Sequence, residues 1–195
     1  SLGGKLSMQL TLESPQLVNK LVVADIAPVA YKPSHDAIFS ALKAVREARC
    51  ESRAAAAQIM ASRLDDDMVI QFLLMSLRRE GNGFYQWRFN LPAIEAGYGA
   101  ARAGLEGEGQ FNGPVQFIKG GDSNYMLPQH WEAILALFPQ ATVKVIPGCG
   151  HWLHVQKPQL FNGIVARFLA GKIADADGDR PEKLEQQGSV GSADT

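Results

Sequence analysis

Short apolar runs alternate with longer amphipathic segments along this chain. Three of the runs are rich in β-branched residues and are bounded by polar residues, Gly or Pro, which is typical of strands buried on both faces of a parallel sheet. They cover residues 18–26 (with the core 21–24), 114–119 and 141–146. Helical patterns cover 1–11, 35–75, 91–105, 129–138 and 160–169. Strands that alternate with helices predict an α/β fold built on a parallel sheet.

Local signals set some of the element boundaries. Glu13-Ser14-Pro15 should end the first helix, because Pro lacks an N–H donor and restricts the residue before it. The acidic run 65–67 predicts the N-terminus of a helix over 68–77, in preference to a metal site. Gly81-Asn82-Gly83 predicts a turn, and the alternation in 84–89 predicts a short strand after it.

The spacing of the strands predicts the domain organisation. The helical block between the first two strands is too long for an ordinary crossover, so we expect an insertion above the C-terminal edge of the sheet. The predicted parts are a core over 1–30, a helical insertion over 31–113, and the rest of the core over 114–172. Residues 173–195 are polar, without an apolar period, and predict a disordered tail.

Composition narrows the classes of protein. Of 195 residues, 46% are hydrophobic and 20% charged, which is ordinary for a globular domain, and a net charge of −1 gives no attraction to nucleic acid. No apolar stretch reaches the roughly 18 residues of a membrane span. Cys50 and Cys149 form neither a metal pattern nor a disulfide framework. We expect a cytoplasmic protein, or a mitochondrial one if the source is eukaryotic, without a metal or cofactor; its oligomeric state stays open.

Polar residues that can carry chemistry follow the predicted strands. In open α/β sheets, ligands bind beyond the carboxyl ends of the strands. Asp25 lies where the first predicted strand ends, and Asp122 and His151 lie in the loops that follow the second and third. Ser1 is followed by Leu2 and a pair of glycines, and then by a helix. A hydroxyl, an imidazole and a carboxylate are the parts of a nucleophilic triad.

These residues stand in recognisable motifs. Ser1-Leu-Gly-Gly-Lys5 resembles the second half of the nucleophile elbow, G-x-S-x-G, of the α/β-hydrolase superfamily. That elbow is a sharp strand-to-helix turn that exposes the Ser hydroxyl, and the Gly two positions on leaves room for the turn. Three more segments resemble one branch, the small esterases of the bacterial YbfF type and their mitochondrial relatives: Val22-Val-Ala-Asp-Ile-Ala-Pro28, Trp87-Arg-Phe-Asn-Leu-Pro92 and Gly148-Cys-Gly-His-Trp-Leu-His154.

The resemblance covers residues 1 to about 172 and implies the C-terminal part of an α/β hydrolase, beginning at its nucleophile. Ser1 would be the nucleophile, although a Ser before a helix is also a common cap. His151 would be the general base and His154 a structural neighbour. The acid is open: we favour Asp122, in the turn where the superfamily most often keeps this carboxylate, over Asp25, the alternative position.

The same resemblance implies the rest of the site. The backbone N–H of Leu2 would stabilise the oxyanion, with a second donor from a loop that is not in this sequence. Tyr125 and Trp152, next to the proposed acid and base, are the candidates for the pocket wall, and the helical insertion would be the cap. We therefore expect this chain alone to be nearly inactive, and, because of an unpaired strand edge and exposed apolar sheet faces, either to aggregate or to need its missing half.

The function that the resemblance implies is hydrolysis of carboxylic esters or thioesters with small to medium acyl chains, so the partner would be a small-molecule ester. Two other Ser-dependent chemistries of the superfamily stay open, carbon–carbon bond hydrolysis and cofactor-free haloperoxidase activity. A non-enzymatic alternative is an inactive, truncated relative that serves as a binding protein.

Overall fold

The computed structural model describes residues 1–106 and 109–171, which divide into two units. The core unit comprises Ser1–Ala30 and the described residues from Gly104 onward, and the helical unit comprises Tyr31–Ala103. The helical unit thus ends at Ala103, whereas the predicted insertion ran to Gly113. The difference arises because Phe111 is buried in the core unit and its N–H bonds to the carbonyl of Leu137. The predicted tail, 173–195, lies outside the described residues.

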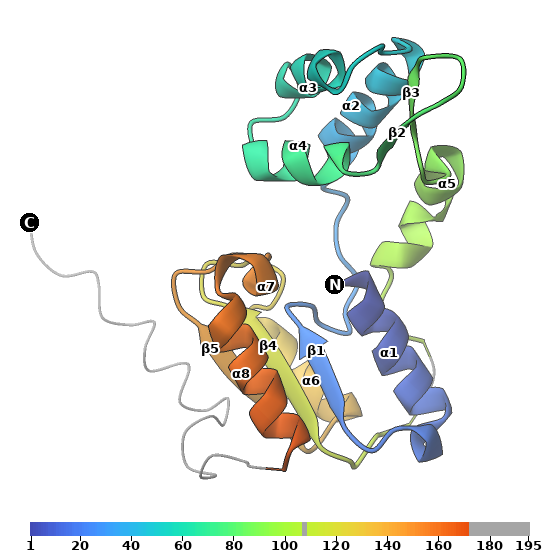
Figure 1. Cartoon of the computed structure of the whole chain (residues 1–195). Coiled ribbons are helices and arrows are strands. Elements are labelled where there is room, and N and C mark those ends of the chain that lie inside the picture. The colour runs from blue at the N-terminus through green and yellow to red at the C-terminus, as the bar shows by residue number, and fades with distance from the viewer. Residues whose placement is uncertain (107–108, 172–195) are drawn as a thin grey trace, which may run out of the picture. The chain divides into compact units, whose positions relative to one another are not determined.

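The core unit contains a three-stranded parallel sheet in the order β1-β4-β5 (Figure 1). The strands are β1 (Leu21–Ala24), β4 (Val115–Gly120) and β5 (Ala141–Ile146). In the register, Leu21 lies opposite Val115, and Val115 lies opposite Ala141. The three strands therefore start level with one another, and their carboxyl ends meet at one edge. The predicted α/β class with a parallel sheet is confirmed.

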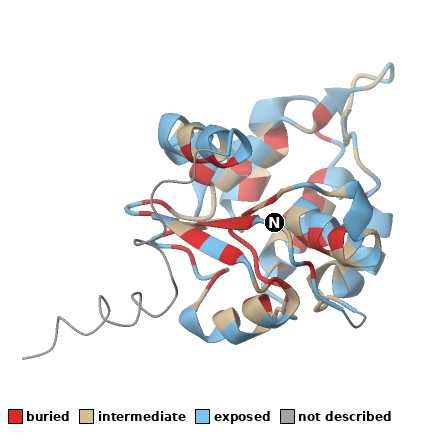
Figure 2. Cartoon of the chain, turned by 90° about the horizontal axis from the view of Figure 1, so that it is seen from below, coloured by how far each residue is buried: buried red, intermediate tan, exposed pale blue. Residues whose placement is uncertain are grey.

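Helices cover both faces of this sheet. The helices of the core unit are α1 (Leu2–Glu13), α6 (Trp131–Leu137), α7 (Leu153–Gln156) and α8 (Pro158–Leu169), with short 3-10 turns η1 (Pro15–Leu17) and η2 (Pro128–His130). The rings of Phe117 and Trp131 are packed edge-on, with centroids 6.3 Å apart. The helix α6 therefore packs on the face of the sheet to which Phe117 points. The next residue, Ile118, belongs to a cluster with Ile164 of α8 on the opposite face. Figure 2 shows the buried strand positions between these helices.

One glycine sets how closely α1 approaches the sheet. A Cβ added at Gly4 would lie 2.7 Å from Ile26 Cγ2 and 3.2 Å from Val23 Cγ1. A Cβ at Gly3 would meet nothing within 4 Å among the described residues. The Gly of the elbow motif is therefore not the one that this packing requires. Beside this contact, the buried Lys5 ammonium donates a hydrogen bond to the carbonyl of Val29 at 2.9 Å, and burial lowers the pKa of this amine.

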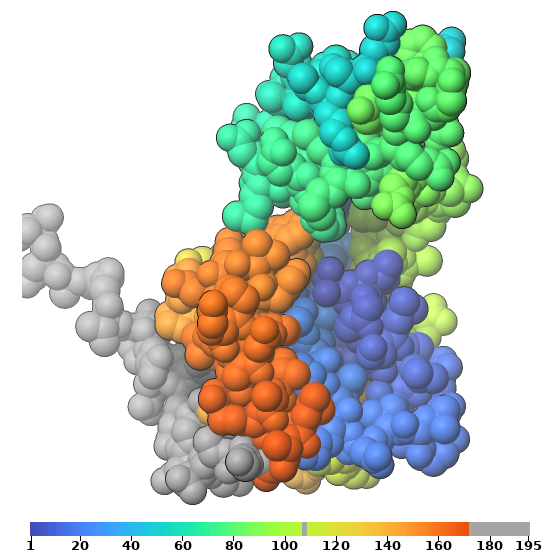
Figure 3. All heavy atoms as spheres, viewed as in Figure 1, coloured from blue at the N-terminus to red at the C-terminus, as the bar shows by residue number. Residues whose placement is uncertain are grey.

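The opposite side of α1 is apolar and exposed. Leu2, Leu6 and Leu10 recur at helical spacing and are each about half exposed or more. In Figure 3, α1 and α8 form the front surface of the core unit. Within the described residues, β1 has a strand neighbour, β4, on one side only.

The helical unit has its own hydrophobic core. Its elements are α2 (Asp36–Glu47), α3 (Arg53–Ala61), α4 (Asp67–Leu74), the hairpin β2 (Leu77–Arg79) and β3 (Tyr85–Trp87), and α5 (Leu91–Arg102). The core gathers residues of α2, α3, α4, β2 and α5, among them Phe39, Leu42, Met60, Ile70, Leu77 and Leu91. No helix in the described part of the chain is long and apolar enough to cross a membrane.

The structure corrects the predicted helix over 68–77. The helix α4 ends at Leu74, and Leu77 begins the strand β2 instead. The cause is tertiary: the Arg53 guanidinium donates to the carbonyls of both Leu74 and Leu77, and Leu77 pairs with Trp87 across the hairpin. The start of α4 agrees with the prediction, since Asp66 accepts the N–H groups of Met68 and Val69 as an N-cap.

The contact at Gly4 predicts opposite effects for two similar substitutions. Gly→Ala inside a helix normally stabilises by about 0.5–1 kcal/mol. We expect this gain for Gly163→Ala in α8, where a Cβ would touch only the flexible end of Arg167 at 3.4 Å. For Gly4→Ala, overpacking against Ile26 should cost about 1–3 kcal/mol and exceed the gain. Urea unfolding of both variants measures the difference; equal stabilisation would contradict the packing argument.

Candidate active site

The three loops that leave the sheet at its carboxyl edge converge. Asp25 follows β1, the turn 120–125 follows β4, and the loop 147–152 follows β5. The loops are joined by backbone hydrogen bonds, from Gly121 to Ile146 at 2.8 Å and from Asp122 to Cys149 at 3.0 Å. The polar residues that the sequence placed on separate loops therefore lie in one region of the core unit.

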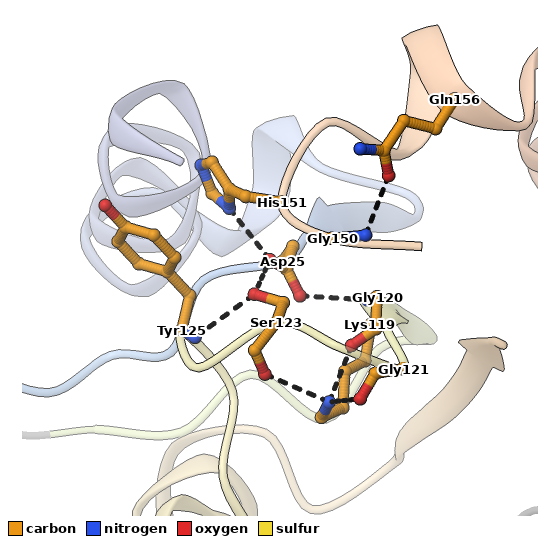
Figure 4. A network of polar contacts seen from close by, with 9 residues as sticks. All are labelled: Asp25, Lys119, Gly120, Gly121, Ser123, Tyr125, Gly150, His151 and Gln156. Atoms are coloured by element: carbon orange, nitrogen blue, oxygen red, sulfur yellow. Dashed lines mark hydrogen bonds and ion pairs between the residues drawn. The ribbon is translucent and has the colours of Figure 1, made fainter. Parts of the chain in front are cut away.

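Asp25 is the buried centre of this region, with an exposed fraction of 1%. Its Oδ1 accepts the N–H of Gly120 at 3.0 Å, and its Oδ2 accepts from the hydroxyl of Ser123 and from Nδ1 of His151 at 2.8 Å (Figure 4). A buried charge is tolerated only where hydrogen bonds replace water, and here three donors do so. Its backbone has φ of +49°, a left-handed conformation that Asp adopts more readily than most residues.

His151 is held from two sides. Because a carboxylate only accepts, Nδ1 carries the hydrogen in the bond to Asp25, and in the neutral ring Nε2 then has the lone pair with which it can act as a base. The Tyr125 ring stacks on the imidazole, with centroids 4.1 Å apart and planes 28° apart. The His151 side chain is 26% exposed, so the ring reaches the surface while its partner carboxylate is buried.

Glycines allow the acid and base loops to approach. A Cβ added at Gly120 would lie 2.6 Å from the Cys149 carbonyl oxygen, a backbone atom that cannot move aside cheaply. On the other loop, the N–H of Gly150 donates to Oε1 of Gln156 at 2.7 Å, which fixes the residue before His151 (Figure 4). The side chain of Gln156 on α7 is thus a support that sequence reasoning missed.

Lys119 supports the turn after β4. Its ammonium donates to the carbonyls of Gly120, Gly121 and Ser123, at 2.6, 3.2 and 3.2 Å. The sequence did not predict this role, because a single lysine at the end of an apolar strand is normally expected to be a solvent-exposed charge.

Asp122, the acid favoured from the sequence, lies on the surface of the turn after β4. It is exposed, and its backbone N–H bonds to Cys149. Among the described residues, no hydrogen bond or ion pair joins its carboxylate to His151. The structure therefore brings Asp25, the alternative acid, to the base, and Ser123 occupies the place in the turn that contacts Asp25.

Ser1 lies at the start of α1, whose packing on Val23 and Ile26 sets its place in the core unit. It is the N-cap residue, but its side chain makes no capping hydrogen bond. The backbone nitrogen of Ser1 lies within electrostatic reach of the negative charge of Asp25. No hydrogen bond joins the Ser1 hydroxyl to His151 in the described part of the chain.

The remaining predicted site residues lie on the same elements. Leu2 is the first residue of α1, so its N–H has no acceptor within the helix. Trp152 precedes α7, and its carbonyl accepts the N–H groups of Val155 and Gln156. Burial raises the pKa of the Cys149 thiol, which is buried within the loop that carries His151. His130 is a local cap: its Nδ1 accepts from Leu127, and burial lowers its pKa.

Comparison with known proteins decides the family. Residues 1–158 match the family model of the α/β-hydrolase fold. The chain belongs to the α/β-hydrolase family. Esterase YbfF of Escherichia coli K12 is 42% identical over 170 residues, which cover 87% of this chain and 65% of that protein. The mouse sn-1-specific diacylglycerol lipase ABHD11 is 38% identical over 176 residues, which cover 87% of this chain and 57% of that enzyme.

A solved structure of this α/β-hydrolase family agrees. A marine microorganism esterase superposes with a TM-score of 0.83 and 34% identity, over 86% of this chain and 67% of that chain. The resemblance to the YbfF branch is thus confirmed. The chain spans 65% or less of the length of these two curated relatives.

The bond from Gly150 to Gln156 gives a test of the base loop. Gln156→Ala should free the Gly150 amide and destabilise the loop by about 1 kcal/mol, the usual net value of such a bond. Gln156→Glu keeps an acceptor oxygen and should leave the loop in place. Amide hydrogen exchange at Gly150, followed by NMR, measures both. Equal protection in the wild type and Gln156→Ala would show that this side chain does not hold the loop.

Proposed function

We propose that the full gene product containing this chain is a serine hydrolase that cleaves carboxylic esters or thioesters with small to medium acyl chains. The observation that carries the proposal is the Asp25–His151 pair, a buried carboxylate on an imidazole whose other nitrogen is available as a base. The names of the relatives, an esterase and a diacylglycerol lipase, support a carboxylic ester as the substrate class.

In this proposal Ser1 is the nucleophile, His151 the general base and Asp25 the acid of the triad. The assignment of Asp25 rests on its bond of 2.8 Å to His151 and on its three donors, whereas Asp122 is exposed. The role of Ser1 rests on its position before α1, where its hydroxyl is not used as a helix cap.

The first half of the reaction forms an acyl-enzyme. The Ser1 oxygen attacks the ester carbonyl carbon while Nε2 of His151 takes the hydroxyl proton. The carbonyl oxygen becomes an oxyanion, to which the N–H of Leu2 donates at the positive end of α1. The carbon–oxygen bond to the alcohol then breaks, and His151 returns the proton to that alcohol.

The second half releases the acid. Water attacks the acyl carbon, His151 takes a proton from it, and the bond to the Ser1 oxygen breaks as that oxygen regains the proton. Asp25 keeps its charge throughout, orients the imidazole and stabilises the imidazolium in both halves. The proposed walls beside the acyl group are Tyr125, whose ring stacks on His151, and Trp152, the residue that follows His151 in the sequence.

Labelling tests the nucleophile. A fluorophosphonate reagent should label the full gene product at Ser1, because an activated Ser hydroxyl attacks phosphorus as it attacks an ester. Ser1→Ala should abolish both the labelling and the hydrolysis of p-nitrophenyl esters, whereas Ser62→Ala, an exposed serine of the helical unit, should change neither. Full activity in Ser1→Ala would refute the proposal.

Two matched substitutions test the acid. Asp25→Asn keeps the side-chain shape and suits the left-handed backbone, but it removes the charge that stabilises the imidazolium. We expect a loss of about 10⁴-fold in kcat, as for removal of a triad carboxylate. Asp122→Asn should keep kcat within a few-fold of the wild type, because its side chain is exposed. The reverse order of losses would assign the acid to Asp122.

A further inference from the structure

Lys5 is a buried cation that the proposed mechanism does not use. It lies one helical turn after Ser1 on α1 and is 6% exposed. Its ammonium donates to the carbonyl of Val29 at 2.9 Å, and its backbone N–H donates to the carbonyl of Ser1 at 3.2 Å. A single residue therefore contacts both the proposed nucleophile and the segment that follows the proposed acid.

We propose that Lys5 is a positioning residue of the esterase reaction, which fixes the place of Ser1 relative to the Asp25–His151 pair. The inference rests on the proposed function and goes beyond it, because it assigns to the helix after the nucleophile a side chain that sets the spacing within the triad.

The first argument concerns how the nucleophile is held. In the described part of the chain, no hydrogen bond joins the Ser1 hydroxyl to His151, so the way in which α1 is held has to set the distance between them. Gly4 lets α1 pack closely on β1 (Figure 1). Apolar packing is non-directional, however, and does not by itself fix the position of a helix along a strand. The bond from Lys5 to Val29 is directional and adds this constraint.

The second argument concerns the segment after the acid. Asp25 has a left-handed φ of +49°, a conformation that persists where the surrounding structure holds it. Further along this segment, the Pro28 carbonyl accepts the N–H of Leu105 at 3.1 Å, and the next carbonyl, that of Val29, accepts the Lys5 ammonium. The Lys5 side chain thus joins the segment that carries the acid to the helix that begins at the nucleophile.

The third argument is energetic. Burial lowers the pKa of the Lys5 amine, because the ammonium loses its hydration. A buried charge adds little net stability, since the cost of its desolvation offsets its hydrogen bonds, and an apolar side chain of similar size is often tolerated in its place. Stability alone therefore does not account for a lysine here, whereas a directional contact that fixes α1 does.

Lys20 offers a matched control at the other end of the sheet. Its ammonium donates to the carbonyls of Phe168 and Leu169, each at 2.9 Å. It precedes the first residue of β1, whereas the proposed site lies at the carboxyl edge of the sheet. Lys20→Met therefore removes the same chemical group, with two hydrogen bonds to carbonyls, at a place remote from the site.

The experiment compares Lys5→Met, Lys5→Arg and Lys20→Met in the full gene product. Met keeps an unbranched apolar stem but has no donor, and Arg keeps both the charge and the donors. Hydrolysis of a p-nitrophenyl ester gives kcat/KM, and titration with a small fluorophosphonate counts competent sites, so misfolded protein does not enter the value per site. The rate of the same labelling reports the reactivity of Ser1 without a bound ester.

We expect kcat/KM per titrated site to fall about tenfold or more in Lys5→Met, because a small misplacement of a reacting group costs on this scale. Labelling of Ser1 should slow by a similar factor. Lys5→Arg should recover most of both losses, and Lys20→Met should keep the wild-type values per site. If Lys5 served only in folding, Lys5→Met would have fewer competent sites, but each would react at the wild-type rate.

Three results would overturn the inference: wild-type values per site in Lys5→Met, an equal loss in Lys20→Met, or a folded Lys5→Arg as impaired as Lys5→Met. If Lys5→Met gives no titratable sites, Lys5→Gln, whose amide nitrogen is one bond nearer the backbone, takes its place with the same expected loss. The proposed function fails separately, if the wild type hydrolyses no ester or Ser1→Ala retains activity, and the inference then fails with it.

Discussion

The site of this protein depends on one buried charge. The Asp25 carboxylate is almost fully removed from water and is held by donors from a neighbouring strand end, a turn and a loop. An ion in such a place costs several kcal/mol unless its oxygens are bonded, so the three loops at the sheet edge have to meet around it. The base is one of its donors, which means that the interaction that makes the burial tolerable also orients the imidazole.

The backbone around this charge is arranged to let the loops approach. Gly120 has no side chain where the carbonyl of Cys149 passes, and its N–H therefore reaches Oδ1 of Asp25. Asp25 itself adopts a left-handed conformation at the end of β1, which turns its side chain away from the direction that a continuing strand would give it. The parallel register of β1, β4 and β5 brings these positions level, so the sheet serves as the rigid base of the site.

Each of the two units has its own hydrophobic core. The helical unit buries side chains of α2 to α5 around its own centre, and the core unit buries the faces of a parallel sheet. All of the proposed catalytic residues belong to the core unit. They lie on its two chain segments, one before and one after the inserted helical unit. An insertion between strands leaves such a sheet intact, because β1 and β4 pair directly although the whole helical unit separates them in sequence.

Periodicity and motif by themselves determined the fold class, the positions of the three strands of the parallel sheet, including 141–146 to the residue, and the loops that carry the chemistry. They did so because β-branched runs, breakers and cap residues act over a few neighbours. Only the tertiary structure decided that His151 meets Asp25, that Ser123, Lys119 and Gln156 support the pair, and that Leu77 begins a hairpin. Each of these depends on where a side chain points and on a partner far away in sequence, and a linear pattern contains neither.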